Sequence, residues 1–250
     1  MIRWCVVLLA VVPLWAQTLL GGPNTAPPGD AVLRLLDARV LSLKSWQANF
    51  TKLAMEGTNA ITQSGTVRFA RQPTGPGQLA VEKGRADFLM QMKGREMNYC
   101  IVSGADSIVW QVISDGNARQ ILRFDLNRPI PRVTQNLRTL NPINAVNPLS
   151  LLQQIRGHFD FTLQGIEELG GRRFYQLAGK LKPGVQSPVS LARLRIGMED
   201  SFLHRIILCD AHGNPALDMN LAGVRFNLDL EDALFVYAPP AGANVIDFNA

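Results

Sequence analysis

The chain has 250 residues and a formal net charge of +5. Its hydrophobic fraction of 47% is that of a globular protein, which excludes an intrinsically disordered chain. The Lys and Arg residues are spread out and form no runs, so the charge does not indicate a nucleic-acid-binding protein. The length suits one large β domain or two small ones, with a substantial core.

The N-terminus has the pattern of an export signal. Arg3 precedes an apolar run that ends at Ala16 and is shorter than the roughly 20 residues that a transmembrane helix needs. We predict a signal peptide over residues 1–16, cleaved near Ala16, with an uncleaved anchor as the alternative. Residues 17–29 are rich in Gly and Pro, so they are expected to form a flexible leader. Nothing after them indicates a domain boundary, and residues 30–250 are predicted to form one domain.

The period of the apolar residues changes after position 43. From Ala31 to Leu43 they recur every three or four positions, which predicts an amphipathic helix capped by Gly29 and Asp30. From Ser45 to Met55 they alternate, which predicts a half-buried strand that follows the helix directly.

Further strand-like runs, separated by turn residues, occupy most of the remaining chain. These runs are 65–71, 86–93, 97–103, 107–114, 119–126, 159–167, 173–182, 191–198, 203–210, 216–227 and 233–237. Residues 127–147 have no clear period and predict a long loop, after which Asn147 and Pro148 begin a short second helix. The absence of strand–helix alternation predicts a mainly β (α+β) fold: a curved antiparallel sheet or open barrel of about eleven strands.

The residues that usually carry catalysis form no recognisable site. The three histidines, His158, His204 and His212, have no metal-ligand spacing, and the paired carboxylates fall at strand ends, as solvated turn charges do. We therefore expect no enzyme activity, no metal and no cofactor. Cys100 and Cys209 can either form a disulfide in an exported chain or remain as two buried thiols.

Large apolar side chains alternate along several predicted strands. Phe88, Met90 and Met92 are on one strand, and Trp110 lies on another. A sheet of this size covered by helices either packs solidly or encloses a cavity, and methionine and aromatic side chains suit an adaptable, lipid-like ligand. The pattern alone favours the solid core.

Four segments resemble the periplasmic lipoprotein carrier family, LolA, with its relatives LolB and the RseB-type sensor domain. A helix runs into SWQANFTK, and there is a GxVxFARxP run, an SGxxxxxW turn and strand, and a terminal FVYAPPAGANVID. These segments are 45–52, 65–73, 103–110 and 235–247. The resemblance runs from about residue 30 to the end of the chain, and the last segment is its most specific part.

The resemblance implies an unclosed antiparallel β-barrel with a helical lid, located in the periplasm. Its apolar cavity would hold the acyl chains of a lipoprotein or a similar cargo. The implied partners are an inner-membrane release complex and an outer-membrane acceptor, and the protein would be a monomer. The alternative is a LolA-like sensor or scaffold that binds a protein partner without lipid transport.

In the family, an arginine just before a proline holds the lid closed through hydrogen bonds. Arg71 matches this arginine, but Gln72 separates it from Pro73, so Arg68 is a substitute candidate and a plain surface arginine remains an alternative. The candidate residues for the lid and cavity are Leu36, Val40, Leu43, Phe50, Phe69, Arg71, Phe88, Met90, Trp110, Leu149, Leu151 and Leu152.

Overall fold

The computed structural model describes residues 28–72, 81–116, 118–128, 143 and 145–249. The predicted signal segment and most of the predicted loop 127–147 lie outside the described residues. No helix within the described ranges combines the length and the apolar character that crossing a bilayer requires.

Twelve strands form one sheet in the order β12-β6-β5-β4-β3-β2-β1-β11-β10-β9-β8-β7, which leaves β12 and β7 at opposite edges. The strands are β1 Ser45–Glu56, β2 Asn59–Gln72, β3 Val81–Met92, β4 Arg95–Ser103, β5 Ile108–Asp115, β6 Ala118–Asp125, β7 Phe159–Leu169, β8 Arg172–Leu181, β9 Leu191–Gly197, β10 Leu203–Cys209, β11 Pro215–Phe226 and β12 Val245–Asp247. Every pair is antiparallel except β12 with β6. The expected mainly β, unclosed antiparallel sheet is confirmed.

Helix α1, Gly29–Ser42, leads directly into β1 as the change of period predicts. The predicted cap is wrong, because Pro28 occupies the N-cap position and no side chain caps the helix. Asp30 lies in the first turn, where its charge complements the helix dipole. Gly29 is required for packing, since a Cβ atom there would lie 2.5 Å from the carbonyl oxygen of Phe161 on β7.

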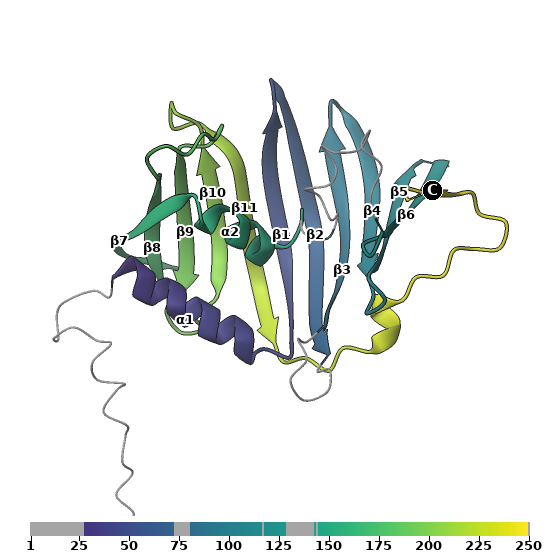
Figure 1. The fold of residues 1–250 in the computed structure, drawn as a ribbon, viewed down its shortest axis with the longest axis horizontal. Helices are drawn as coiled ribbons and strands as arrows, with labels where there is room; N and C mark the ends of the chain where they lie inside the picture. Colours follow the sequence, from purple (N-terminus) through teal and green to yellow (C-terminus); the bar gives the residue numbers. More distant parts are fainter. Residues whose placement is uncertain (1–27, 73–80, 117, 129–142, 144, 250) are drawn as a thin grey trace, which may run out of the picture.

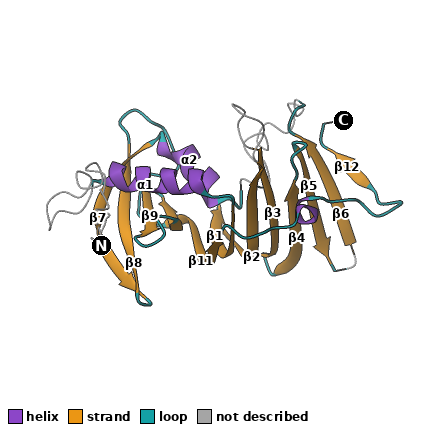
Figure 2. Cartoon of the chain, turned by 90° about the horizontal axis from the view of Figure 1, so that it is seen from below, coloured by secondary structure: helices purple, strands orange, loops and turns teal. Residues whose placement is uncertain are grey.

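Helix α2, Pro148–Arg156, begins as predicted. The Asn147 side chain accepts a hydrogen bond of 3.0 Å from the Leu149 amide, and Pro148 takes the first helical position. The Arg156 guanidinium donates to both carboxylate oxygens of Asp37 on α1, at 2.7 and 2.8 Å. The two helices are thus connected, and they lie over the β7 to β1 half of the sheet on one face (Figures 1 and 2).

The strand register divides the side chains between two faces. We call the face under the helices the helix-side face. It carries Trp46, Ala48 and Phe50 of β1, whose cross-strand partners on β2 are Phe69, Val67 and Gly65. These large side chains belong to the main core cluster. The opposite, outer face carries Lys83, Arg85 and Asp87 of β3, which alternate with the small helix-side residues Gly84 and Ala86.

The C-terminal segment covers part of the outer face. Residues 233–237 were predicted as a strand, and this prediction is wrong: Asp232–Phe235 form a 3-10 helix, η3. Lys83 pairs with Asp232 at 2.6 Å and Arg85 donates to the Leu234 carbonyl, so side chains of β3 hold this segment and bury Phe235. The last strand is β12, which pairs in parallel with β6 and which sequence reasoning did not predict.

Gly65 lets β2 approach β3 closely. A Cβ atom at this position would lie 2.2 Å from the Asp87 carbonyl oxygen and 2.5 Å from the Phe88 Cα atom. Phe50 and Phe88 meet edge to face over the space that Gly65 leaves, with ring centroids 5.7 Å apart.

We predict that Gly65→Ala lowers the free energy of unfolding by about 2–3 kcal/mol, because backbone atoms cannot move aside as a side chain can. Gly157→Ala is the control, since Gly157 has a helical φ of −65° and no atom within 4 Å of a Cβ. Urea unfolding of both variants measures the difference. Equal stabilities would contradict the close approach at Gly65.

Candidate functional site

The end of α1 rests on the aromatic centre of the helix-side face. Trp46 stacks on Phe69 with ring centroids 4.7 Å apart, and Phe202 meets Trp46 at 5.3 Å. Val40 and Leu43 from the end of α1 line the same place, where the remaining hollow has a volume of only about 10 Å³. Side chains therefore fill the space between α1 and β2.

Arg71 on β2 joins the sheet to the end of α1. Its guanidinium Nη1 donates to the carbonyl oxygens of Val40 at 3.0 Å and Leu41 at 3.2 Å. These carbonyls belong to the last turn of the helix, which carries the negative end of the helix dipole. The Leu43 amide also donates to the Val40 carbonyl, at 3.3 Å. Arg68, the other candidate for a lid contact, instead pairs with Asp87 on the outer face at 3.0 Å. The inserted Gln72 therefore does not prevent Arg71 from reaching α1.

Eleven of the twelve candidate lid and cavity residues lie on the helices or on the helix-side face. Seven of them are buried, whereas Val40, Met90, Leu151 and Arg71 are partly exposed. The buried ones are Leu36, Leu43, Phe50, Phe69, Phe88, Leu149 and Leu152.

Trp110 is the exception. It pairs with Val102 on the outer face, and its ring lies 5.6 Å from that of Tyr237 in the C-terminal segment. The prediction that Trp110 lines the cavity with the other residues is therefore wrong. The apolar run in β5 has large residues on both faces, and it is Val109 that points toward the main core.

The two cysteines are free. Cys100 lies on β4 and Cys209 on β10, and four strands separate these two in the sheet. Five strand spacings of about 4.8 Å give a separation far beyond the reach of a disulfide, so the disulfide alternative is wrong. Burial, together with the neighbouring Asp87 carboxylate, raises the pKa of the Cys100 thiol to about 11. The thiol is therefore protonated and unreactive at neutral pH.

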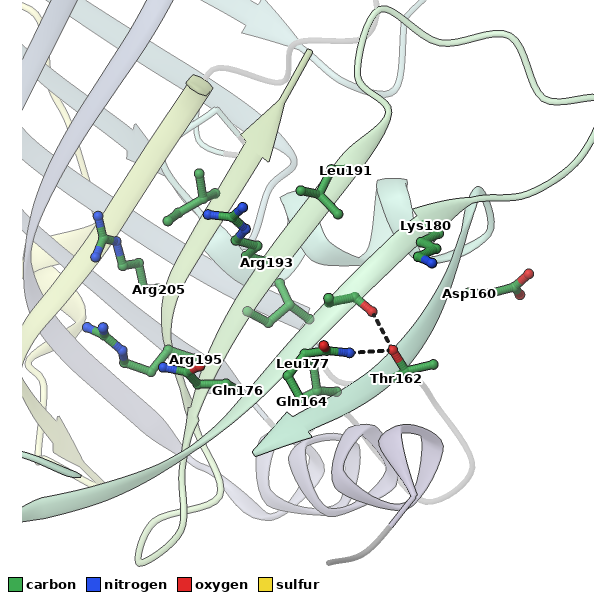
Figure 3. Close-up of a pocket in the computed structure, with 13 residues that line it drawn as sticks. Asp160, Thr162, Gln164, Gln176, Leu177, Lys180, Leu191, Arg193, Arg195 and Arg205 are labelled. Atoms are coloured by element: carbon green, nitrogen blue, oxygen red, sulfur yellow. Dashed lines mark hydrogen bonds between the residues drawn. The ribbon is translucent and has the colours of Figure 1, made fainter. Parts of the chain in front are cut away.

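A second candidate site is a hollow of about 750 Å³ on the outer face of β7 to β10 (Figure 3). Its acidic and basic side chains are Asp160, Lys180, Arg193, Arg195 and Arg205. Arg195 pairs with Glu167 at 2.7 Å and Arg205 with Asp218 at 2.6 Å. Lys180 and Arg193 have no carboxylate partner among the residues that the structure describes. Sequence reasoning did not identify this hollow, although the alternation of Arg193 and Arg195 along β9 was a signal for it.

His204 belongs to a polar cluster at the turn between β9 and β10. Its Nε2 atom lies 2.9 Å from the Asp200 carboxylate, which also accepts hydrogen bonds from Arg172 at 2.6 Å and from the Phe202 amide at 3.1 Å. Burial opposes the ionisation of Asp200, but the hydrogen bonds from His204, the Phe202 amide and Arg172 together lower its pKa. The cluster fixes the turn between β9 and β10.

The strand order and the positions of both helices define an unclosed antiparallel sheet with two helices over one half of one face. No protein-family model and no curated protein matches the chain.

Several solved structures are similar to it. They include the lipoprotein LppX of Mycobacterium tuberculosis, with 13% identity over 80% of this chain and 96% of that one, at a TM-score of 0.47. LprF of Mycobacterium bovis has 15% identity over 86% of this chain and 99% of its own, at a TM-score of 0.46. MucB, in the complex structure of Pseudomonas aeruginosa MucA/MucB, has 17% identity over 84% of this chain and 61% of its own, at a TM-score of 0.44. These TM-scores lie below 0.5, so the fold is defined by the strand order and helix positions of this chain itself.

Removing the Arg71 guanidinium should loosen the end of α1. In Arg71→Met the Val40 and Leu41 carbonyls lose the guanidinium donor, and Val40 keeps only the hydrogen bond from the Leu43 amide among the described residues. We expect the amides from Ala38 to Ser42 to exchange with solvent about tenfold faster. Arg68→Met is the matched control, because it removes a guanidinium from the same strand but from the outer face. Hydrogen–deuterium exchange with mass spectrometry measures the exchange rates of these amides in both variants. Unchanged exchange in α1 would show that Arg71 does not hold the helix.

The Asp200 cluster predicts a pH-dependent contribution to stability. Because the pKa of Asp200 is lowered in the folded state, its contribution is complete above the ordinary aspartate pKa of about 3.9 and is lost as the pH falls through the folded value. At pH 7, Asp200→Asn should cost about 1–2 kcal/mol. The difference from the wild type should shrink below about pH 4. Denaturant unfolding at several pH values tests this, with the exposed Asp229→Asn as the control. A difference that does not vary with pH would refute it.

Proposed function

We propose that this protein is a periplasmic binding protein that holds the acyl chains of a lipoprotein, or of a similar lipid-anchored cargo, between its helices and its sheet. The observation that carries the proposal is the contact of Arg71 with the last turn of α1. It is the contact that the sequence resemblance implies for a helical lid. After export and cleavage near Ala16, the domain over residues 30–250 would carry cargo from an inner-membrane complex toward an outer-membrane acceptor.

The composition of the helix-side face supports this proposal. The surface beneath the helices is built from aromatic and aliphatic side chains, and α1 contributes Val40 and Leu43 to it. Such a surface can exchange contacts with the helices for contacts with acyl chains at little cost, because both partners are apolar.

The packed interior means that binding must accompany movement of α1. Each buried methylene contributes about 0.8 kcal/mol, so a permanently open cavity for several acyl chains would bind too tightly for release. The two hydrogen bonds of Arg71 and the ion pair of Arg156 with Asp37 favour the closed state. Closing therefore offsets part of the binding energy and helps to release the cargo.

A second candidate function is the binding of an acidic protein partner on the outer face. The hollow shown in Figure 3 favours it, because Lys180 and Arg193, which have no carboxylate partner among the described residues, lie beside the apolar residues Leu191 and Ile207. In that case the helix-side face would serve only as the core of a sensor or scaffold.

Native mass spectrometry of the mature protein, purified from its envelope, tests the leading proposal. We expect the wild type to carry lipid or acylated peptide, and Val40→Glu to lose it because a carboxylate would enter the apolar surface. Leu41→Glu is the matched control, since Leu41 is the next residue on α1 and is 76% exposed. It should keep the bound mass.

A clean apo mass for the wild type under gentle conditions would count against lipid binding and would favour the second candidate. Retention of the bound mass by Val40→Glu would show that the cargo binds elsewhere.

A further inference from the structure

One row of side chains crosses the helix-side face at right angles to the strands. Each member is the direct cross-strand partner of the next, from β4 through β3, β2, β1 and β11 to β10. The row is Met97, Met90, Gln63, Lys52, Met219 and Ile206. Two adjacent polar side chains thus lie between three methionines.

The rows on either side of this one are apolar over β3, β2, β1 and β11. Tyr99, Phe88, Gly65, Phe50 and Leu221 form the row on one side, and Arg95, Met92, Ile61, Ala54 and Leu217 form the row on the other. Arg95, at the β4 end of its row, pairs with Asp115. Lys52 and Gln63 are therefore a polar pair with apolar neighbours in both adjacent rows. Packing of a solid core does not require a lysine and a glutamine at this place.

Among the described residues, the Lys52 ammonium is only partly satisfied. It donates one hydrogen bond there, of 2.9 Å, to the Ala145 carbonyl oxygen, although an ammonium carries three donors. It forms no salt bridge with any carboxylate among the described residues. Burial lowers its pKa, which shows that its surroundings disfavour an uncompensated positive charge.

The Gln63 side chain is also incompletely bonded. Its Nε2 atom donates to the Met90 sulfur at 3.5 Å, and sulfur is a weak acceptor. Its Oε1 atom is buried and has no hydrogen-bond partner within the described ranges of the chain. A buried acceptor without a donor is costly, so a ligand that supplies one would gain this energy on binding.

We propose that Lys52 and Gln63 form the head-group site for an acyl-chain amphiphile with an anionic oxygen head, and that its chain lies along the methionine row and the adjacent apolar rows. This inference rests on the proposed lipid-binding function and specifies the chemistry of the ligand. The head compensates the charge of Lys52 through its carboxylate or phosphate oxygens. A hydroxyl group on the same head donates to Gln63 Oε1.

The surroundings of the pair suit such a ligand. Met90 and Met97 are partly exposed at the β4–β3 end of the row, whereas Met219 and Ile206 are buried at its β11–β10 end. The unbranched thioether side chains of methionine adapt to chains of different shape. Lys52 also contacts the segment just before α2, so binding of the head can be sensed by that helix.

Three probes with the same oleoyl chain test this inference. Oleate has a carboxylate head, oleoyl lysophosphatidate has a phosphate and a hydroxyl group, and monooleoylglycerol has hydroxyl groups but no charge. Displacement of a fluorescent fatty-acid analogue below the micellar concentration measures the affinity of the purified mature protein for each. We expect the charged probes to bind the wild type at least about tenfold more tightly than monooleoylglycerol.

Variants then test whether Lys52 and Gln63 cause the preference for charged probes. Lys52→Met should abolish it while binding of monooleoylglycerol changes by less than about twofold, and Lys52→Arg should retain most of it. Gln63→Leu should weaken lysophosphatidate more than oleate, because only lysophosphatidate offers a hydroxyl group. Lys93→Met, at the exposed turn between β3 and β4, is the charge-matched control and should leave all affinities unchanged. Thermal unfolding verifies that each variant is folded.

The results distinguish failure of the head-group site from failure of the proposed lipid-binding function. A higher affinity for lysophosphatidate than for oleate assigns the head to a phospholipid source, and the reverse assigns it to a free carboxylate. Equal affinities of charged and neutral probes, or a preference that survives Lys52→Met, would overturn the head-group site and leave the lipid-binding function standing. Failure of the wild type to bind any of the probes would overturn both.

Discussion

The position of β1 between β2 and β11 is the constraint on which the rest of the structure depends. Its pairing with β2 is local, whereas its pairing with β11 joins residues about 170 positions apart and fuses two antiparallel meanders into one sheet. Because side chains alternate along a strand, this pairing sets the face of every residue on the neighbouring strands. It puts Trp46 and Phe50 under the helices, and it aligns Lys52 with Gln63 and Met219.

Sequence patterns were sufficient to predict the elements that depend only on neighbouring residues in the chain. These are the apolar stripe of α1, the change of period at Ser45 and the start of α2 at Asn147 and Pro148. The 3-10 helix around Phe235 and the short parallel β12 depend on Lys83, Arg85 and β6, which lie more than 100 residues away. The prediction that Trp110 lines the cavity was wrong for a related reason. A strand with large residues on both faces does not indicate which of them faces the helices.

The candidate site could be predicted where its residues match the sequence pattern of the family that the chain resembles. Arg71 was found through the resemblance, although only the structure shows that its guanidinium reaches the Val40 and Leu41 carbonyls. The Lys52–Gln63 pair could not be found in this way, since its members lie on adjacent strands and neither belongs to a motif. In the proposed function the two features are complementary, because Arg71 would favour the closed arrangement of the helices and ligand binding at the polar pair would favour the open one.

Movement of α1 would also affect the edge of the sheet. The start of the helix lies against the Phe161 carbonyl on β7, and β7 is an edge strand of the sheet in the part of the chain that the structure describes. Ile166 and Leu169 on that strand are already half exposed. A helix that moves away would uncover unpaired backbone groups, which can template pairing with another chain. Glu167 and Glu168 lie between these apolar residues. Glu167 pairs with Arg195, so it is the charge of Glu168 that would discourage aggregation while the protein is open.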